Sequence, residues 1–140
     1  MVHDMGIFTA DISIAPLDQP LKRRQIEVMV DTGSAYNWIP RRLLEELGVE
    51  VQRAERFEMA DGQVLERDTG LALLFASGRT TATVVVFAEN GDMSLLGAIG
   101  LEGLNLRVDL NRKELVPAGP VPVAAGSWTA VATLAGVLRQ

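Results

Sequence analysis

The sequence predicts an all-β fold, either a barrel or a sandwich, on three observations. At least six short runs of apolar and β-branched residues have the length of strands. Turn residues, among them Pro, Gly, Asp and Asn, separate these runs at close intervals. Only residues 40–48 carry a clear helical pattern.

The N-terminal third predicts a β-hairpin followed by a short helix. Residues 6–15 and 22–30 indicate two strands, and the prolines between them turn the chain. A brief extended piece at residues 38–39 leads into the helix PRRLLEELG. Its leucines lie on one face, Pro40 takes the first helical position and Gly48 suits a left-handed C-cap.

The rest of the chain predicts three more pairs of strands. In RFEMADGQVLERD, the pair Asp61-Gly62 fits a tight type I′ turn between two strands. The other strands are expected at residues 71–76 and 80–87, joined at Ser77-Gly78-Arg79, and at residues 106–110 and 114–117.

Length and composition fit one globular domain. The chain has 140 residues, of which 48% are apolar and 22% charged, and these are ordinary values for a folded protein. The net charge of −5 argues against a nucleic-acid partner, which would need clustered excess Lys and Arg. We expect residues 1–116 to form the folded domain and residues 117–140 to form a Pro/Gly linker and an apolar C-terminal tail.

The apolar part of this tail, residues 123–138, is shorter than the roughly 20 residues that span a membrane. A packing segment or a partner-binding helix is therefore the favoured interpretation, and membrane association is the less favoured one. The N-terminus has neither the basic flank nor the apolar run of a signal peptide. A cytoplasmic location is expected.

Few catalytic chemistries fit the residues that the chain contains. It has no cysteine, and His3 is its single histidine. Disulfides, thiol nucleophiles, Ser-His and Cys-His catalysis and zinc sites built from Cys or His are therefore excluded. No metal or other cofactor is expected. Carboxylates, lysines, hydroxyls and backbone groups remain to carry any chemistry.

The stretch IEVMVDTGSAYNWIP, residues 26–40, places Asp31 directly after an apolar strand. Asp-Thr-Gly-Ser is ordinary turn chemistry, so a plain turn is one interpretation. The other is that Asp31 stands on a rigid loop inside the molecule, where a carboxylate is costly to keep unless it has a function.

Three motifs in the order VMVDTGSAYNWIP, ADGQV and SLLGAIGLEGL resemble the retroviral-type (retropepsin-like) aspartic proteases, and most of all the short single-domain bacterial members. The resemblance runs from about Gly6 to Pro117. It implies an all-β, retropepsin-like acid-protease barrel with one or two short helices and one lobe per chain. It also implies an aspartic endopeptidase that acts on peptide or protein substrates.

In that family the Asp of the triplet is catalytic, which carries over to Asp31. The resemblance implies that Thr32 points away from the cleft and hydrogen-bonds its copy across a two-fold axis. Gly33 matches a position where a side chain would obstruct water and substrate, and Ser34 is expected to hydrogen-bond the outer carboxylate oxygen. Because the mechanism needs two facing carboxylates and the chain has one such motif, the active form is expected to be a homodimer.

Two further elements follow from the resemblance. The tip of a hairpin is expected to act as a flap that closes over the substrate, formed by Met59, Ala60, Asp61, Gly62 and Gln63. A core strand is expected to lie beside the catalytic loop and to lead into a short helix, formed by Leu95, Leu96 and Gly97. Retroviral flaps are richer in glycine, and retroviral enzymes often have a charged or polar pair where this chain has Ala98-Ile99.

Two other interpretations stay open. One is a module of the same fold that dimerises or binds peptide without appreciable proteolysis. The other is an unrelated β-barrel in which Asp-Thr-Gly is only a turn. Trp38 and Trp128 are expected to be core or interface aromatics, and Asp109 to be a turn residue.

Overall fold

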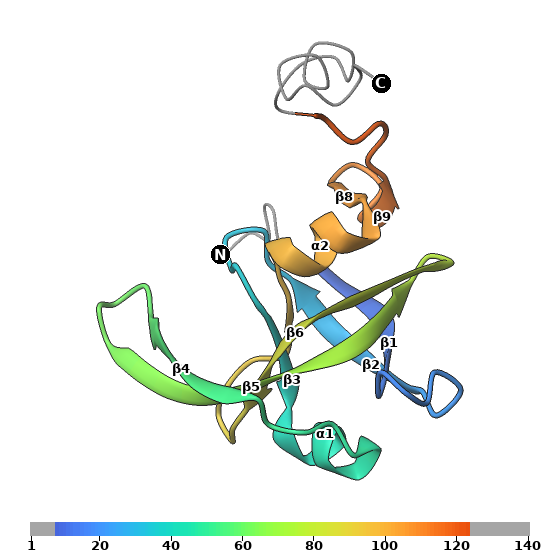
Figure 1. The fold of residues 1–140 in the computed structure, drawn as a ribbon. Coiled ribbons are helices and arrows are strands. Elements are labelled where there is room, and N and C mark those ends of the chain that lie inside the picture. Colours follow the sequence, from blue (N-terminus) through green and yellow to red (C-terminus); the bar gives the residue numbers. More distant parts are fainter. Residues whose placement is uncertain (1–7, 124–140) are drawn as a thin grey trace, which may run out of the picture.

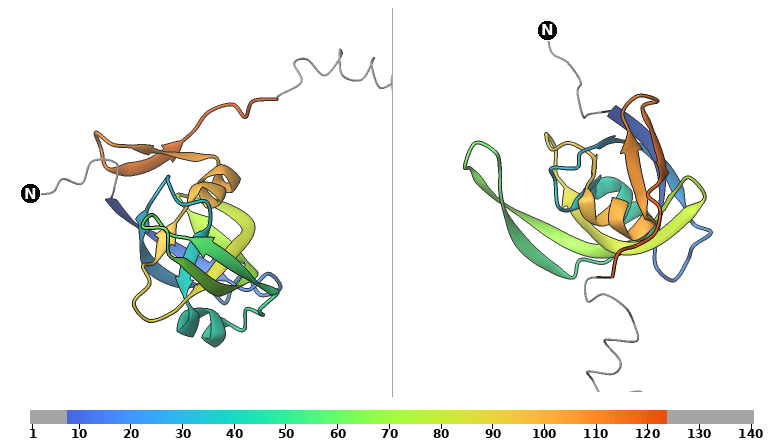
Figure 2. Two further views of the ribbon diagram at one scale, coloured as in Figure 1. Left: turned by 90° about the vertical axis from the view of Figure 1, so that its left-hand side faces the viewer. Right: turned by 90° about the horizontal axis from the view of Figure 1, so that it is seen from above.

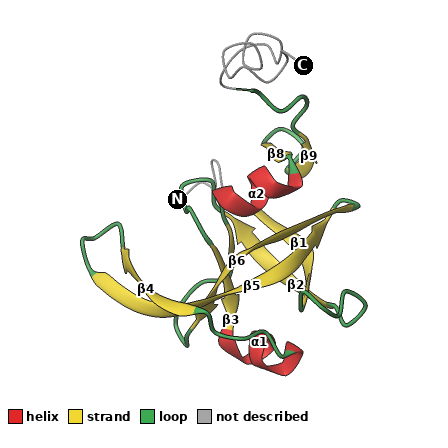
Figure 3. Ribbon diagram, in the orientation of Figure 1, coloured by secondary structure: helices red, strands yellow, loops and turns green. Residues whose placement is uncertain are grey.

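The computed structural model describes residues 8–123. The described chain is mostly β-structure with two short helices, so the all-β prediction is confirmed (Figure 3). Trp128 and the apolar tail from residue 124 lie outside the described residues. In chain order the elements are β1 (Phe8–Ala15), β2 (Arg24–Val30), β3 (Asn37–Pro40), α1 (Arg41–Leu47), β4 (Arg53–Glu58), β5 (Val64–Ala76), β6 (Arg79–Ala88), β7 (Leu95–Leu96), α2 (Ala98–Leu104), β8 (Leu106–Asp109) and β9 (Glu114–Pro117).

Seven strands form one sheet that closes into a barrel. Their order is β1-β2-β7-β3-β6-β5-β4, and β1 pairs again with β5, where Ile14 lies opposite Leu74. Within the described residues β4 pairs only with β5, so it is an appendage to the closed barrel. The β4–β5 hairpin consequently projects from the barrel, as its green ribbon shows in Figures 1 and 2.

The first and last predicted hairpins are confirmed. Strands β1 and β2 are antiparallel, with Phe8 opposite Val30 and Ile12 opposite Ile26. Strands β8 and β9 form a separate two-stranded sheet in which Val108 lies opposite Leu115. At the turn of that hairpin, the carboxylate of Asp109 accepts hydrogen bonds from two backbone amides, as expected of a turn residue.

The middle of the chain differs from the prediction. The strand predicted directly after Asp61-Gly62 and the strand predicted at residues 71–76 are one continuous strand, β5. Its first half pairs with β4 and its second half with β6. The polar stretch Glu66-Arg67-Asp68 stays extended within this strand, and Arg67 and Asp68 form ion pairs beside the hairpin.

The type I′ turn predicted at Asp61-Gly62 is also wrong. That turn needs positive φ at both central residues, and of this pair only Gly62 has it, at 87°. The hairpin closes instead through the Gly62 amide, which donates to the Met59 carbonyl at 2.9 Å, and Gly62 follows the turn as its left-handed residue. Positive φ at two successive residues occurs at Ser77 (50°) and Gly78 (77°), which join β5 to β6.

The predicted helix at residues 40–48 is present as α1, and Gly48 has the predicted left-handed conformation, φ 81°. The helix begins at Arg41, so Pro40 is its N-cap and not its first helical residue as predicted. A two-turn helix is not stable alone in water, so packing must hold it. Leu44 and Leu47 supply that packing, since both are almost fully buried in the core. Helix α2 lies at the opposite end of the barrel, next to β8 and β9 (Figure 1). No helix of the described chain is long and apolar enough to cross a membrane.

Candidate active site

Asp31 opens a loop, residues 31–36, that leaves the end of β2 and returns to the sheet as β3. Strand β7 lies between these two strands, parallel to β2 and antiparallel to β3. The loop must therefore pass over the end of β7. The backbone amide of Asp31 donates to the carbonyl of Leu96 in β7, at 3.0 Å. This bond fixes the position where the carboxylate leaves the sheet.

Two hydrogen bonds within the loop hold Asp31, one through its backbone and one through its side chain. The Ser34 amide donates to the Asp31 carbonyl oxygen at 3.1 Å, which closes a turn. The Gly33 amide donates to Oδ1 of Asp31 at 2.9 Å. A Cβ at position 33 would lie 3.3 Å from the same oxygen, tighter than an ordinary contact. Glycine at this position therefore avoids a close contact with the carboxylate.

The start of helix α2 holds the other side of the loop. The amides of Ala98 and Ile99 donate to the carbonyls of Ser34 and Ala35, at 2.8 and 3.0 Å. The loop approaches so closely that a Cβ at Gly97 would overlap the carbonyl oxygens of Ser34 and Tyr36. The predicted Leu95-Leu96-Gly97 element does lie beside the Asp31 loop and leads into a helix, and backbone groups make its bonds to the loop.

The hydrogen bond expected between the Ser34 side chain and the Asp31 carboxylate is not formed. The Ser34 hydroxyl donates to the backbone carbonyl of Tyr36 at 3.0 Å, so it braces the loop without touching the carboxylate. Thr32 is exposed, and within residues 8–123 its hydroxyl makes no hydrogen bond. Its predicted bond to a second copy of the chain stays a prediction.

A cleft of about 620 Å³ separates this loop from the projecting hairpin. It brings together Asp31, Gly33 and Ser34 from the loop with Met59 and Ala60 from the predicted flap. The other predicted flap residues, Asp61, Gly62 and Gln63, lie at the tip and do not line it, nor do Thr32, Leu96 and Gly97. The remaining lining residues are Ala35, Tyr36, Trp38, Glu55, Arg56, Phe57, Glu58 and Leu95.

Three aromatic side chains connect the hairpin to the Asp31 loop. Phe57 of β4 packs edge-on against Tyr36, with ring centroids 5.6 Å apart, and against Trp38, at 5.1 Å. Trp38 is only 6% exposed, as expected of a core aromatic. Sequence analysis did not identify Phe57 or Tyr36, because nothing local indicates that residues about twenty positions apart meet across a cleft.

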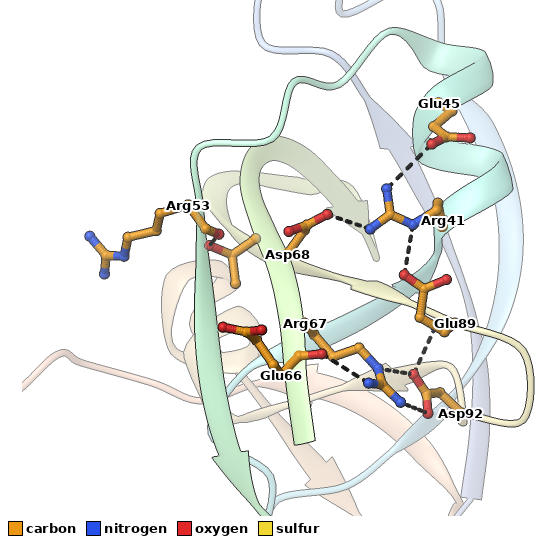
Figure 4. A network of polar contacts seen from close by, with 9 residues as sticks. Arg41, Glu45, Arg53, Glu66, Arg67, Asp68, Glu89 and Asp92 are labelled. Atoms are coloured by element: carbon orange, nitrogen blue, oxygen red, sulfur yellow. Dashed lines mark hydrogen bonds and ion pairs between the residues drawn. The ribbon is translucent and has the colours of Figure 1, made fainter. Parts of the chain in front are cut away.

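The strand that continues the hairpin is fixed to the barrel by two arginines (Figure 4). Arg67 of β5 donates to Asp92 through two of its guanidinium nitrogens: Nε to Oδ2 at 2.7 Å and Nη2 to Oδ1 at 3.0 Å. Arg41, at the start of α1, bonds Asp68 of β5 at 2.5 Å and Glu89 at 2.7 Å. The base of the hairpin is thereby bonded to α1 and to the turn between β6 and β7.

These ion pairs shift the ionisation of their members. The hydrogen bond from Arg67 lowers the pKa of Asp92 below its ordinary value, although burial opposes the shift. The same bond raises the pKa of Arg67. Hydrogen bonds to Asp68 and Glu89 raise the pKa of Arg41. All three groups therefore stay charged at neutral pH and keep the base of the hairpin in place.

No cluster of three or more His, Asp or Glu side chains suited to a metal ion occurs among residues 8–123. The residues that line the cleft are one Asp, two Glu, one Arg, and hydroxyl-bearing, aromatic and apolar side chains. Such a set can present a carboxylate to water.

Comparison with known proteins identifies the family of the chain. A family model described as "Aspartyl protease" matches residues 21–100, which include the Asp31 loop, the hairpin and β7. No curated protein gives a significant match. The chain is similar in structure to the simian foamy virus protease, with 14% identity and a TM-score of 0.45 over 66% of this chain and 92% of that one.

A second similar structure is a retropepsin-like aspartic protease from Rickettsia conorii. It is 16% identical, with a TM-score of 0.44 over 77% of this chain and 91% of that one. The family model covers more than half of the 140 residues and spans the Asp-Thr-Gly motif. The chain therefore belongs to the aspartyl protease family.

Proposed function

We propose that the chain is an aspartic endopeptidase that works as a homodimer, with one Asp31 from each protomer. The observation that supports this proposal is the position of Asp31. Its carboxylate lines the cleft beneath the hairpin, and Oδ1 is held by the Gly33 amide. Bonds to Leu96 and from α2 hold the loop on both sides, so the carboxylate is ready in place before a substrate binds.

One such carboxylate is not sufficient for this chemistry. Two like charges a few ångströms apart cannot both ionise, so a facing pair keeps one proton between them. The pair then offers a base and an acid in the same site. Residues 8–123 contain one Asp-Thr-Gly loop, and a second copy of the chain would supply the other. The exposed position of Thr32 beside Asp31 suits a contact between the two loops.

In the proposed reaction, a water molecule lies between the two carboxylates. The ionised Asp31 takes a proton from the water as its oxygen attacks the carbonyl carbon of the peptide bond, and the protonated Asp31 gives its proton to the carbonyl oxygen. The tetrahedral diol then collapses. The C–N bond breaks, the nitrogen receives a proton from the pair, and an acid and an amine leave. No covalent bond to the protein forms.

The hairpin would close over the bound peptide. Met59 and Ala60 already line the cleft, and we propose that Asp61, Gly62 and Gln63 approach the substrate when the tip moves. Backbone amides in an extended hairpin can bond an extended peptide regardless of its side chains.

Incubation with a peptide library from acidic to neutral pH tests the activity. We expect cleavage by the wild type and none by Asp31→Asn, because an amide can neither share the proton nor activate water. Asp109→Asn, in the β8–β9 turn, is the matched control and should remain active. Full activity of Asp31→Asn would contradict the proposal. Binding of peptides without cleavage by the wild type would support the non-cleaving module instead.

Mixing tests the homodimer. Wild type incubated with an equal amount of Asp31→Asn should exchange protomers, and activity should fall to about half, since mixed dimers hold a single carboxylate. Dilution should lower the specific activity through the range in which sedimentation shows dissociation. A monomer with unchanged specific activity on dilution would rule the dimer out.

A further inference from the structure

Asn37, the first residue of β3, is a buried polar side chain with all of its bonds inside the protein. It is 0% exposed, and among the described residues only Thr69 and Thr83 are other buried polar side chains. Its Nδ2 donates to the carbonyl of Val84 at 3.0 Å and to the Thr83 hydroxyl at 3.4 Å. Its Oδ1 accepts a bond from the Gly97 amide at 3.0 Å.

These bonds connect three parts of the site. Asn37 follows the Asp31 loop directly, Val84 belongs to β6, and Gly97 stands between β7 and α2. The next two amides, those of Ala98 and Ile99, bond the loop carbonyls of Ser34 and Ala35. The three successive amides of residues 97–99 thus donate to Asn37, Ser34 and Ala35. Of these three acceptors, only Asn37 accepts through its side chain.

The packing around Asn37 is equally specific. A Cβ at Gly100 would overlap Oδ1 of Asn37 and would press on Leu96. The glycine therefore leaves the space that the amide group fills. Helix α2 has no polar side chain at Ala98 or Ile99 to bond the loop. The loop side supplies that polar group through Asn37.

We propose that Asn37 is a positioning residue for Asp31. Its side chain fixes the position of the Asp31 loop relative to the β7–α2 junction. The Leu96 carbonyl, at the same junction, accepts the hydrogen bond from the Asp31 amide. This inference rests on the proposed protease function for its effect on catalysis. Its structural part, that Asn37 holds the loop on α2, is independent of that function.

The chemical consequence concerns the distance and angle between the paired carboxylates. Their shared proton depends on close approach, so a displaced loop changes how tightly the pair holds it. A misplacement of about 1 Å can cost about 100-fold in rate. Loss of Asn37 should therefore lower kcat and shift the pH dependence of kcat/KM, with less effect on KM.

The experiment compares Asn37→Leu and Asn37→Ser with two controls. Asn37→Leu leaves the Gly97 amide without its side-chain acceptor and removes the side-chain bond to the Val84 carbonyl, and the serine side chain is too short to reach both. Thr83→Val removes the longest of the Asn37 contacts and keeps the bond to Gly97. Leu47→Ala opens a cavity under α1, at the other end of the barrel, and reports what loss of stability alone does.

All variants are assayed at a temperature at which circular dichroism shows them folded. We expect both Asn37 variants to lose about 10- to 100-fold in kcat and to shift at least one limb of the pH profile. Thr83→Val and Leu47→Ala should keep the wild-type profile, because a smaller folded fraction changes the amplitude of the profile and leaves its shape unaltered. Wild-type kcat and pH limbs in Asn37→Leu would overturn the proposal.

Amide hydrogen exchange tests the same inference without activity. In both Asn37 variants the amides of Ala98 and Ile99 should exchange faster relative to those paired between β5 and β6, and in the two controls they should not. Unchanged relative exchange in the Asn37 variants would overturn the inference. A wild type that cleaves no peptide would refute the proposed function alone, because the exchange result decides the role of Asn37 separately.

Discussion

Arg67 and Asp92 form a two-point ion pair that joins the base of the β4–β5 hairpin to the turn between β6 and β7. The contacts are 2.7 and 3.0 Å long, and the two side chains are only 17% and 11% exposed. Asp92 also accepts the Glu89 amide at 2.7 Å. This one carboxylate therefore stabilises both the turn and the hairpin that lines the cleft.

This pair should make the stability of the protein sensitive to acid. The pKa of Asp92 is lowered in the folded state, so its contribution is complete above the unfolded value of about 4 and is lost as pH falls through the lower folded value. We expect Asp92→Asn to lose about 1–3 kcal/mol at neutral pH and to vary less with pH below about 4. Urea denaturation at neutral pH and below about pH 4 measures the free energy of unfolding.

Arg42→Gln, which breaks an exposed pair with Glu46, is the control, and its free energy of unfolding should differ little from that of the wild type. Equal acid sensitivity in Asp92→Asn and wild type would contradict the prediction.

Phe57→Ala should release the hairpin from the Asp31 side of the cleft. The change removes the edge-on contacts with Tyr36 and Trp38, each worth about 0.5–1.5 kcal/mol. With Trp128→Phe as background, Trp38 is the single tryptophan, and its emission should shift to longer wavelength as water reaches it. We also expect KM to rise more than kcat falls. Phe57→Leu keeps an apolar contact and should lie between the two. Unchanged Trp38 emission in Phe57→Ala would show that the aromatic contact does not hold the hairpin.

Gly97→Ala should damage the site directly. The added methyl would overlap the carbonyl oxygens of Ser34 and Tyr36, so the loop or α2 must move, at a cost of about 1–3 kcal/mol. Gly48→Ala, at the C-cap of α1, is the control. It has open space but a φ of 81°, so it should cost about 1–2 kcal/mol from backbone strain alone and leave the Asp31 loop in place. Activity per folded molecule should fall for Gly97→Ala and be kept by Gly48→Ala. The reverse order of activities would contradict the packing described around Gly97.

Local signals were sufficient for several features of the fold. The apolar strand before Asp31 and the Leu95-Leu96-Gly97 motif predicted the position of the Asp31 loop and of the strand beside it, because each motif is contiguous in sequence. Gly48 marked the end of α1, since a left-handed cap favours glycine. The turn at Asp61-Gly62 was assigned wrongly because the same dipeptide also fits a longer connection in which only the glycine has positive φ.

Other parts of the site depend on contacts that no local pattern encodes. Asn37 lies 60 positions from Gly97, and its role appears only when β7 enters between β2 and β3. Phe57 resembles any alternating strand residue until the hairpin folds toward Trp38. Ser34 was expected to bond Asp31, but the chain bends so that the Tyr36 carbonyl is its acceptor. In each case tertiary structure selects one partner among several that the sequence permits.

The pH dependence of peptide cleavage should be bell-shaped, with its maximum on the acid side of neutrality. In the proposed homodimer, the two Asp31 carboxylates would share one proton and lose or gain it as a pair in two steps. Rising pH removes that proton, so the pair loses its acid, and falling pH adds a second proton, so the pair loses its base.

Unfolding at low pH would also produce an acid limb, because the Arg67–Asp92 pair weakens as pH falls. Asp92→Asn separates the two causes. At every pH at which circular dichroism shows this variant folded, the acid limb of its activity profile should coincide with that of the wild type. An acid limb that instead follows the loss of the circular dichroism signal would reflect unfolding. A rate that rises steadily into alkaline pH would contradict a shared proton and would return Asp31 to the role of a turn residue.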